Sequence, residues 1–150
     1  SRHTDMTTLY GRLAKGFRVP QATELYRLQS GQAVAEIDAE TGDSVEFGIR
    51  NHYEHLSYDL SAYLMSKRDV IFQDRDRYNV SGAKTTHRGI EGSLQWQLSS
   101  IWSLGGNASY ARHRYDSDIQ ILGSRGSIEG NDIDTAPRHF GSLQITADFA

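Results

Sequence analysis

The most regular feature of this chain is an alternation of apolar and polar residues with a period of two. In residues 56–64 every second side chain is apolar or aromatic, and those between are mostly polar. The pattern recurs in residues 45–50, 90–98, 102–110 and 142–149. A period of two is that of a β-strand with one apolar face, and the 3.6-residue period of an amphipathic helix is nearly absent. The pattern predicts an antiparallel sheet with one apolar and one wet face.

The segments between these strands are alternately long and short. Long polar segments lie at residues 16–43, 67–84 and 116–126, and short ones lie at 51–55, Ser99-Ser100 and 135–138. This order predicts an up-and-down meander with all long loops at one end of the sheet. We expect about seven strands, at residues 7–15, 44–50, 56–66, 85–98, 102–115, 127–133 and 139–149.

Composition narrows the class of protein. A chain of 150 residues is one domain by size, and its net charge of −3 with scattered Lys and Arg residues argues against nucleic acid as a partner. The absence of cysteine excludes a disulfide framework. The sequence contains no apolar run near the roughly 20 residues of a spanning helix, and its N-terminal stretch does not resemble a signal peptide.

Two kinds of β-barrel produce such alternation. In a soluble lipocalin-like barrel the apolar face lines a ligand cavity, whereas in an outer-membrane barrel it faces lipid around a wet lumen. The chain length suits the soluble barrel, but the loop asymmetry and the predicted strands of up to 14 residues favour the membrane. A structural or adhesin-type β protein without transport is a third reading.

The only two tryptophans of the chain sharpen this choice. Trp96 and Trp102 share the apolar face and flank the predicted turn at Ser99-Ser100. An ordinary cross-strand aromatic pair would explain them. Together with the loop asymmetry, we interpret them as a membrane-interface girdle, where an indole buries its ring and keeps its N–H wet. Because an open sheet edge is not tolerated in hydrocarbon, we expect the chain to be a segment of a larger barrel.

Five short motifs, in order along the chain, resemble the barrel domain of TonB-dependent outer-membrane receptors. They are Gly16-Phe17-Arg18-Val19-Pro20 with Ala22-Thr23-Glu24-Leu25-Tyr26; Glu40-Thr41-Gly42 leading to Glu46-Phe47-Gly48; Arg68-Asp69-Val70-Ile71; Asn79-Val80-Ser81-Gly82 with His87-Arg88-Gly89-Ile90-Glu91; and Ala136-Pro137-Arg138-His139. Each motif is weak alone, but together they span nearly the whole chain.

The resemblance implies an internal segment of the C-terminal half of a 22-stranded transmembrane β-barrel, with the plug domain and the remaining strands absent from residues 1–150. It implies a receptor in the bacterial outer membrane that imports a scarce nutrient, most often a ferric siderophore, with haem, cobalamin and glycans as alternatives. Its partners would be outer-membrane lipid, the nutrient and, through the plug, the energy-coupling protein TonB. The protein would be neither an enzyme nor dependent on a cofactor.

Few residues suggest further chemistry. The expected loop at 67–84 carries alternating charges, a pattern that most often reflects self-paired surface charge. Arg68, Arg75 and Arg77 are nevertheless candidates for contact with an anionic ligand or lipopolysaccharide. His52, His55 and His113 lack metal-ligand spacing, and no nucleophile–base pair is evident. The acidic residues Asp116, Asp118, Asp132 and Asp134 lack the spacing of a calcium loop.

Overall fold

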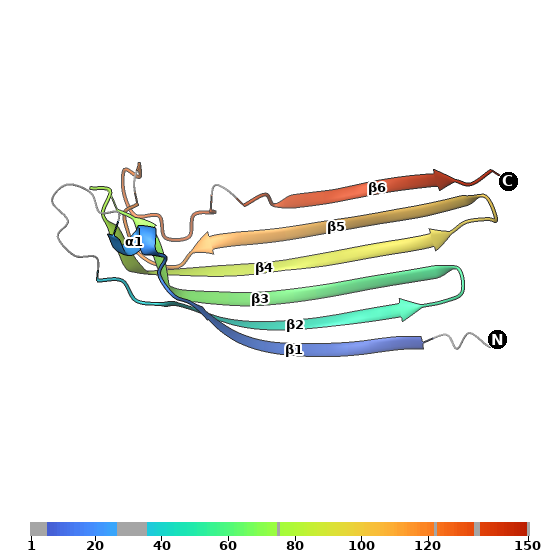
Figure 1. Cartoon of the computed structure of the whole chain (residues 1–150), viewed down its shortest axis with the longest axis horizontal. Helices are drawn as coiled ribbons and strands as arrows, with labels where there is room; N and C mark the ends of the chain where they lie inside the picture. Colours follow the sequence, from blue (N-terminus) through green and yellow to red (C-terminus); the bar gives the residue numbers. More distant parts are fainter. Residues whose placement is uncertain (1–5, 27–35, 75, 122, 134–135, 150) are drawn as a thin grey trace.

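The computed structural model describes residues 6–26, 36–74, 76–121, 123–133 and 136–149, and it forms one antiparallel sheet with a short helix at one end (Figure 1). In order along the chain the elements are β1 (Met6–Arg18), α1 (Ala22–Tyr26), β2 (Glu40–His52), β3 (Leu56–Gln73), β4 (Asn79–Gln97), β5 (Trp102–Tyr115) and β6 (His139–Ala147).

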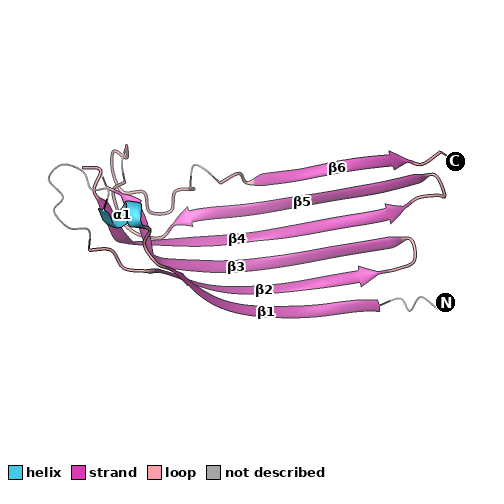
Figure 2. Ribbon diagram, in the orientation of Figure 1, coloured by secondary structure: helices cyan, strands magenta, loops and turns pink. Residues whose placement is uncertain are grey.

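Each strand pairs with the next one along the chain, so the spatial order equals the sequence order (Figure 2). The predicted all-β, up-and-down meander is therefore confirmed. Residues 53–55 and 98–101 form the tight turns, and both lie at the end of the sheet opposite α1. We call these two ends the turn end and the loop end.

The predicted long loop at 67–84 is wrong, because β3 and β4 extend well into it. Only residues 74–78 connect these strands. The register shifts between Lys67 and Val70, where Asp69 has a φ of 56°, so a bulge interrupts the ladder without ending it. The following residues, Val70 to Phe72, include β-branched and aromatic side chains that favour strand structure beyond the bulge.

The predicted strand at residues 127–133 is also wrong, so the described sheet has six strands rather than seven. Gly130 has a φ of 75°, which turns the chain within this segment. The segment still bonds to β5, since the Tyr115 amide donates to the Asn131 carbonyl at 3.1 Å and the Ile133 amide to the His113 carbonyl at 2.9 Å. It therefore runs beside β5 in the direction of β6, as an irregular lead-in to that strand.

This correction moves the predicted short turn at 135–138. With one strand fewer, residues 116–138 together connect β5 to β6, and the described part of this connection begins at the loop end (Figure 1). Strand β6 consequently runs toward the turn end, opposite to the direction that seven strands would give it. The asymmetry of long and short connections is preserved.

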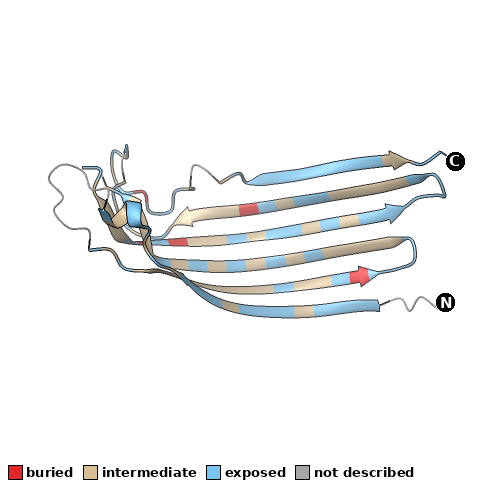
Figure 3. Ribbon diagram, in the orientation of Figure 1, coloured by how far each residue is buried: buried red, intermediate tan, exposed pale blue. Residues whose placement is uncertain are grey.

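A single sheet layer buries little of itself (Figure 3). Among the described residues, the buried hydrophobic side chains are Ala83, Ala111 and Ile128, while twenty large hydrophobic residues are exposed. None of the described helical structure is both long and apolar enough to cross a bilayer. The sheet thus presents one broad apolar face and one broad polar face. The described part of this chain covers neither face.

Candidate functional site: two faces of one sheet

Most apolar side chains of the six strands share one face of the sheet, as the cross-strand register shows. One row across the sheet contains Leu9, Ile49, Leu60, Gly92, Ala108 and Gly141, and the next row toward the turn end contains Thr7, Asn51, Tyr58, Leu94, Gly106 and Leu143. On β3 the apolar Leu60 and Leu64 are 48% and 49% exposed, and the intervening wet-face residues are less exposed. This face therefore does not converge on a dry interior.

The apolar band crosses the strands obliquely. At the loop end, the boundary of the band on β1, β2 and β3 is the row of Lys15, Asp43 and Ser66. On β4 and β5 the boundary lies one row closer to the turn end, at Arg88 and Arg112. On β6 it lies a further row closer, at His139. At the turn end the band stops at Thr7 and Asn51 on the first two strands but continues to Phe149 after β6. Its two edges shift in the same direction, by four and six residues over five strand-to-strand steps.

The tryptophans predicted to form a girdle lie on this face at the turn end. Trp96 pairs with Leu104, and the Trp102 carbonyl accepts from the Leu98 amide at 2.9 Å, so the indoles occupy neighbouring rows rather than one row. They are 44% and 45% exposed. Phe149 packs edge-on to Trp102, with ring centroids 6.4 Å apart. Three aromatic side chains thus gather at the turn-end edge of the apolar band.

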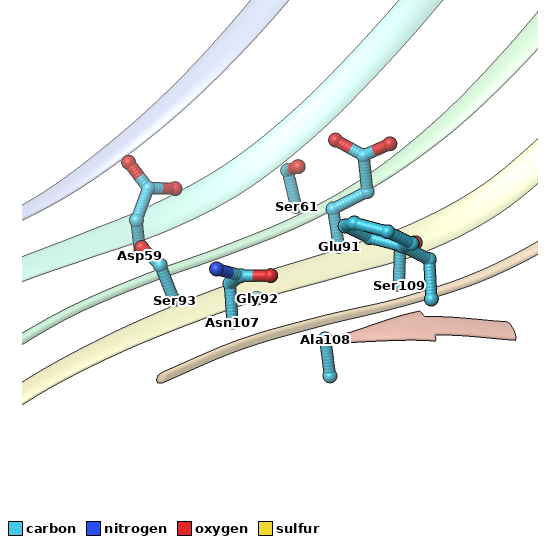
Figure 4. Close-up of a pocket in the computed structure, with 9 residues that line it drawn as sticks. Asp59, Ser61, Glu91, Gly92, Ser93, Asn107, Ala108 and Ser109 are labelled. Carbon is cyan, nitrogen blue, oxygen red and sulfur yellow. The ribbon is translucent and has the colours of Figure 1, made fainter. Parts of the chain in front are cut away.

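The opposite, wet face is hollowed near its centre. A pocket of about 350 Å³ is lined by Asp59, Ser61, Glu91, Gly92, Ser93, Asn107, Ala108, Ser109 and Phe140. Figure 4 shows the carboxylates of Asp59 and Glu91 on the same side of the sheet, with Ala108 pointing to the other side. The lining is rich in carboxylate, hydroxyl and amide groups, as expected of a surface that contacts water or a polar partner.

Tyrosine rings cover part of the wet face. Tyr10 donates a hydrogen bond to Asp59 at 3.2 Å, and Arg50 forms an ion pair with the same carboxylate at 2.6 Å. The Tyr63 ring lies across its register partner Gly89. A Cβ atom at Gly89 would lie 2.9 Å from that ring and from the Tyr110 carbonyl oxygen, so only glycine fits there.

An ion-pair cluster joins the loop-end residues of β1, α1 and β2, and we call Arg18, Glu24 and Glu40 the Arg18 cluster. Arg18 donates to Glu24 at 3.0 and 3.1 Å and to Glu40 at 3.0 and 2.8 Å. The Gln21 amide also donates to Glu24 at 2.6 Å, which caps α1. Hydrogen bonding from Arg18 lowers the pKa of the Glu24 carboxyl below its ordinary value, and burial partly opposes this effect. The cluster pairs one guanidinium with two carboxylates.

The family motifs of the sequence converge on this cluster. The Ile71 amide donates to Glu40 at 2.9 Å, and the Asn79 side chain donates to the Glu24 carbonyl at 2.9 Å. Residues from four of the five motifs thus meet at one place, although they span residues 18 to 79. These contacts could not be recognised from the sequence motifs, because spacing along the chain does not reveal contacts across strands.

The candidate ligand residues are dispersed. Arg68 has the parity of the apolar face and forms an ion pair with Asp43 at 2.6 Å. Arg77 lies in the turn between β3 and β4, where its amide donates to the Asp74 carbonyl at 3.1 Å. Arg75 lies outside the described residues. Their role in binding a ligand stays a prediction.

Within the described part of the chain, no group of three or more His, Cys, Asp or Glu side chains is arranged to hold a metal ion. Asp134, one of the acidic residues considered for calcium, lies outside the described residues. Two histidines, His87 and His113, lie next to each other on the wet face, with their Nδ1 atoms 2.7 Å apart. Met65 on β3 is the register partner of His87. This row could not be recognised from the sequence. The alternation places each of the three residues on the polar face of its predicted strand, but it does not show that they lie opposite one another.

Comparisons with known proteins agree with this geometry. The family model described as "TonB dependent receptor-like, beta-barrel" matches residues 2–149. The fold is similar to that of the ferric yersiniabactin uptake receptor FyuA from Yersinia pestis, with a TM-score of 0.70, 20% identity, and coverage of 95% of this chain and 21% of that one. It is also similar to the copper transporter OprC, with a TM-score of 0.67, 20% identity, and coverage of 93% and 28%. No curated protein matches the sequence. The chain thus spans less than a third of either solved chain, 21% of one and 28% of the other.

Proposed function

This chain belongs to the TonB-dependent receptor-like β-barrel family, and we propose that it forms part of the wall of an outer-membrane receptor that imports a scarce nutrient. In this proposal the six strands belong to a 22-stranded barrel, and the plug domain and the remaining strands lie elsewhere in the protein. TonB would supply energy through the plug. The barrel wall would hold the loops that capture the nutrient, and it would perform no catalysis.

The oblique apolar band is the observation that carries the proposal. Its edges shift by about one residue per strand, which at a rise of about 3.4 Å per residue and a strand spacing of about 4.8 Å corresponds to a tilt of about 35°. Strands of outer-membrane barrels tilt by roughly 35–45° relative to the membrane normal. A band that is level in a lipid bilayer therefore has to cross the strands in this way, whereas a soluble wall has no such requirement.

Trp96 and Trp102 support the same placement. Eight residues separate Trp96 from Arg88, the first charged residue of the apolar face on β4. With the tilt above, this separation is about 22 Å along the membrane normal, close to the apolar band of about 25 Å that such barrels present to lipid. We propose that the two indoles form the girdle at the turn-end interface, and that the loop end faces outward.

We propose a ferric siderophore as the nutrient. The likeness to a ferric yersiniabactin uptake receptor supports this class of cargo, and the pocket of the wet face offers hydroxyl, amide and carboxylate groups to a polar molecule or to the plug. Arg68, Arg75 and Arg77 are proposed to contact the anionic ligand at the loop end. The positions of Arg68 and Arg77, near the β3–β4 hairpin at the loop end, would bring these two residues to the outer opening of the barrel.

Siderophore uptake under iron limitation tests the proposal. Uptake of radiolabelled ferric siderophores is compared between cells that carry the gene for the complete receptor and cells in which it is deleted, each with and without TonB. We expect uptake of at least one siderophore to require both proteins. Partition of the receptor into the aqueous phase on cell lysis, without detergent, would contradict the membrane placement.

A second candidate cargo is a copper ion, and one observation favours it. Met65, His87 and His113 align across β3, β4 and β5 on the wet face, and thioether and imidazole groups are ligands that copper prefers. The copper transporter OprC shares this fold. Thr85 contacts Nε2 of His87 at 2.8 Å, which orients the ring with Nδ1 toward His113.

The two cargoes are separated by the double variant His87→Ala, His113→Ala. If copper is the cargo, this variant should lose copper accumulation in cells and retain ferric siderophore uptake. Met65→Leu should weaken copper accumulation to a smaller degree. Equal copper accumulation in wild type and double variant would eliminate the second candidate.

A further inference from the structure

The apolar face ends in arginines at the loop end of β4 and β5. Arg88 and Arg112 are register partners on neighbouring strands, and Arg114 occupies the next row on the same face. Arg138, the residue immediately before β6, reaches the same place through its ion pair with Asp132. We call these four residues the arginine patch: Arg88, Arg112, Arg114 and Arg138.

The arginine patch carries more positive than negative charge. Asp132 is its one paired carboxylate in the described residues, at 3.8 Å from Arg112 and 3.4 Å from Arg114. The nearby Asp116 accepts a hydrogen bond from Thr86 instead, and no ion pair within 4 Å joins it to a described residue of the patch. Three of the four guanidinium groups, those of Arg112, Arg114 and Arg138, therefore share one carboxylate, and Arg88 has none.

Two details show that the protein alone does not satisfy this patch. Arg88 is exposed and, within the described chain, forms no ion pair, yet its register partner is another cation. Like charges directly opposite each other on a sheet are destabilising. In addition, the Nε atom of Arg112 is buried and has no hydrogen-bond partner. An anion bound over Arg88 and Arg112 would neutralise this like-charge pair and supply hydrogen-bond acceptors.

The position of the patch indicates where that anion comes from. Strand β5 carries Trp102 at its turn end, and Arg112 lies ten residues further along the same face. With a tilt of about 35°, this separation spans about 28 Å along the membrane normal, slightly more than the apolar band of such barrels. Tyr110 lies in the row next to Arg112 and contacts His139 with tilted rings, whose centroids are 5.0 Å apart, and tyrosine is enriched at membrane interfaces. The patch therefore lies at the depth of the outer headgroups.

We propose that the arginine patch binds the phosphate groups of a lipid headgroup in the outer leaflet. The planar guanidinium group matches phosphate oxygens in a bidentate manner. Arg88, Arg112 and Arg114 occupy two adjacent rows, and Arg138 joins them through Asp132, so the patch can hold more than one phosphate. The inference rests on the proposed outer-membrane placement, because it assigns this face to lipid. It adds a specific lipid site, which membrane insertion alone does not require.

Lipid binding by the complete receptor in non-ionic detergent tests the inference. The probes are lipid A with two phosphates, the same lipid with its phosphates removed, and inorganic phosphate, and bound lipid is counted by native mass spectrometry. Arg88→Gln is the main variant because Arg88 is exposed and its removal breaks no ion pair. Arg12→Gln is the matched control, since Arg12 is an exposed arginine on the wet face of β1.

We expect the wild type and Arg12→Gln to bind diphosphorylated lipid A equally, and Arg88→Gln to bind it about tenfold more weakly, as for loss of one charge-assisted hydrogen bond. The double variant Arg88→Gln, Arg112→Gln should bind more weakly still. Equal binding of the dephosphorylated lipid, or an unchanged affinity in Arg88→Gln, would overturn the inference. So would competition by inorganic phosphate at concentrations similar to those of the lipid.

The outcomes separate this inference from the proposed function. A receptor that inserts into bilayers and transports its nutrient, but binds phosphorylated and dephosphorylated lipid alike, contradicts only the lipid site. A receptor that fails to insert into bilayers contradicts the outer-membrane placement, and the lipid site with it.

Discussion

The Arg18 cluster and the arginine patch are both built from arginine at the loop end of the sheet, but their charge balance is opposite. In the first, one guanidinium donates to two carboxylates, and neighbouring backbone and amide groups complete the bonding. In the second, three guanidinium groups share Asp132, and the fourth, that of Arg88, has no ion pair and stands opposite Arg112. The first is satisfied within the described chain and the second is not.

This difference separates a structural role from a binding role. The side chain of Glu40 in the Arg18 cluster is only 13% exposed, so its partner cannot be removed without leaving a poorly solvated charge. The exposed Arg88 already lacks a partner, and its removal leaves nothing unpaired. Substitution of arginine should therefore destabilise the sheet at one place and not at the other.

The largest effect is expected for Arg18→Ala. This variant leaves Glu24 and Glu40 close together without their cation, and we expect a loss of about 2 kcal/mol in the free energy of unfolding. Urea unfolding of the receptor in lipid vesicles measures it, with Arg12→Ala as the control for the loss of an exposed arginine. Equal stability of these two variants would show that the Arg18 cluster is not structural.

A slightly smaller loss is expected for Gly89→Ala, which tests whether a motif residue outside the Arg18 cluster is also structural. The added methyl group would meet the Tyr63 ring and the Tyr110 carbonyl oxygen, both 2.9 Å away. We expect a loss of roughly 1–2 kcal/mol in the free energy of unfolding, because the backbone oxygen cannot move as a side chain can. Gly16→Ala is the control, since a Cβ atom there meets nothing within 4 Å. If both variants unfold alike, close packing does not explain Gly89.

Acid should weaken the Arg18 cluster through Glu24. The folded pKa of this carboxyl is lower than its ordinary value of about 4.3, so the unfolded chain takes up the proton first as the pH falls. The stabilisation is fully present above the ordinary pKa and is lost as the pH falls through the lowered folded value. Unfolding measured from pH 6 to pH 3 should show a shallower decline in Glu24→Gln than in wild type. Parallel curves for the two proteins would contradict this linkage.

The smallest effect is expected at the arginine patch and has the opposite sign. In detergent free of phosphorylated lipid, Arg88→Gln should raise the free energy of unfolding by about 0.5 kcal/mol, because it removes a like-charge pair across β4 and β5. High salt should shrink this gain by screening. A loss of stability in this variant would mean that Arg88 is paired in the folded protein, and the contrast with Arg18 would fail.

Much of the fold could be predicted from the sequence. Strand β5 begins and ends at the predicted residues 102 and 115, and the tight turn after β4 lies at the predicted Ser99-Ser100. Alternation succeeded here because the two faces meet different surroundings along the whole strand. It failed at residues 127–133, where Ile128 and Ile133 are five residues apart and Gly130 turns the backbone. It also failed at the β3–β4 hairpin, where a bulge changes the parity.

The candidate sites were less predictable, although their residues were in view. Arg18, Glu24 and Glu40 belong to motifs that the sequence analysis quoted, and the apolar-face parity of Arg88 and Arg112 could be read from their strands. Neither the Arg18 cluster nor the arginine patch could be recognised, because each depends on which residue of one strand lies opposite which residue of the next.

The sequence by itself determined the two-faced character of the strands, the asymmetry of their connections and the family, because side-chain alternation and short motifs are local properties of the chain. The tertiary structure decided the number of strands, the direction of β6, the oblique course of the apolar band and the meeting of distant arginines and carboxylates. Those features depend on cross-strand register, and register is set by backbone hydrogen bonding between segments that are far apart along the chain.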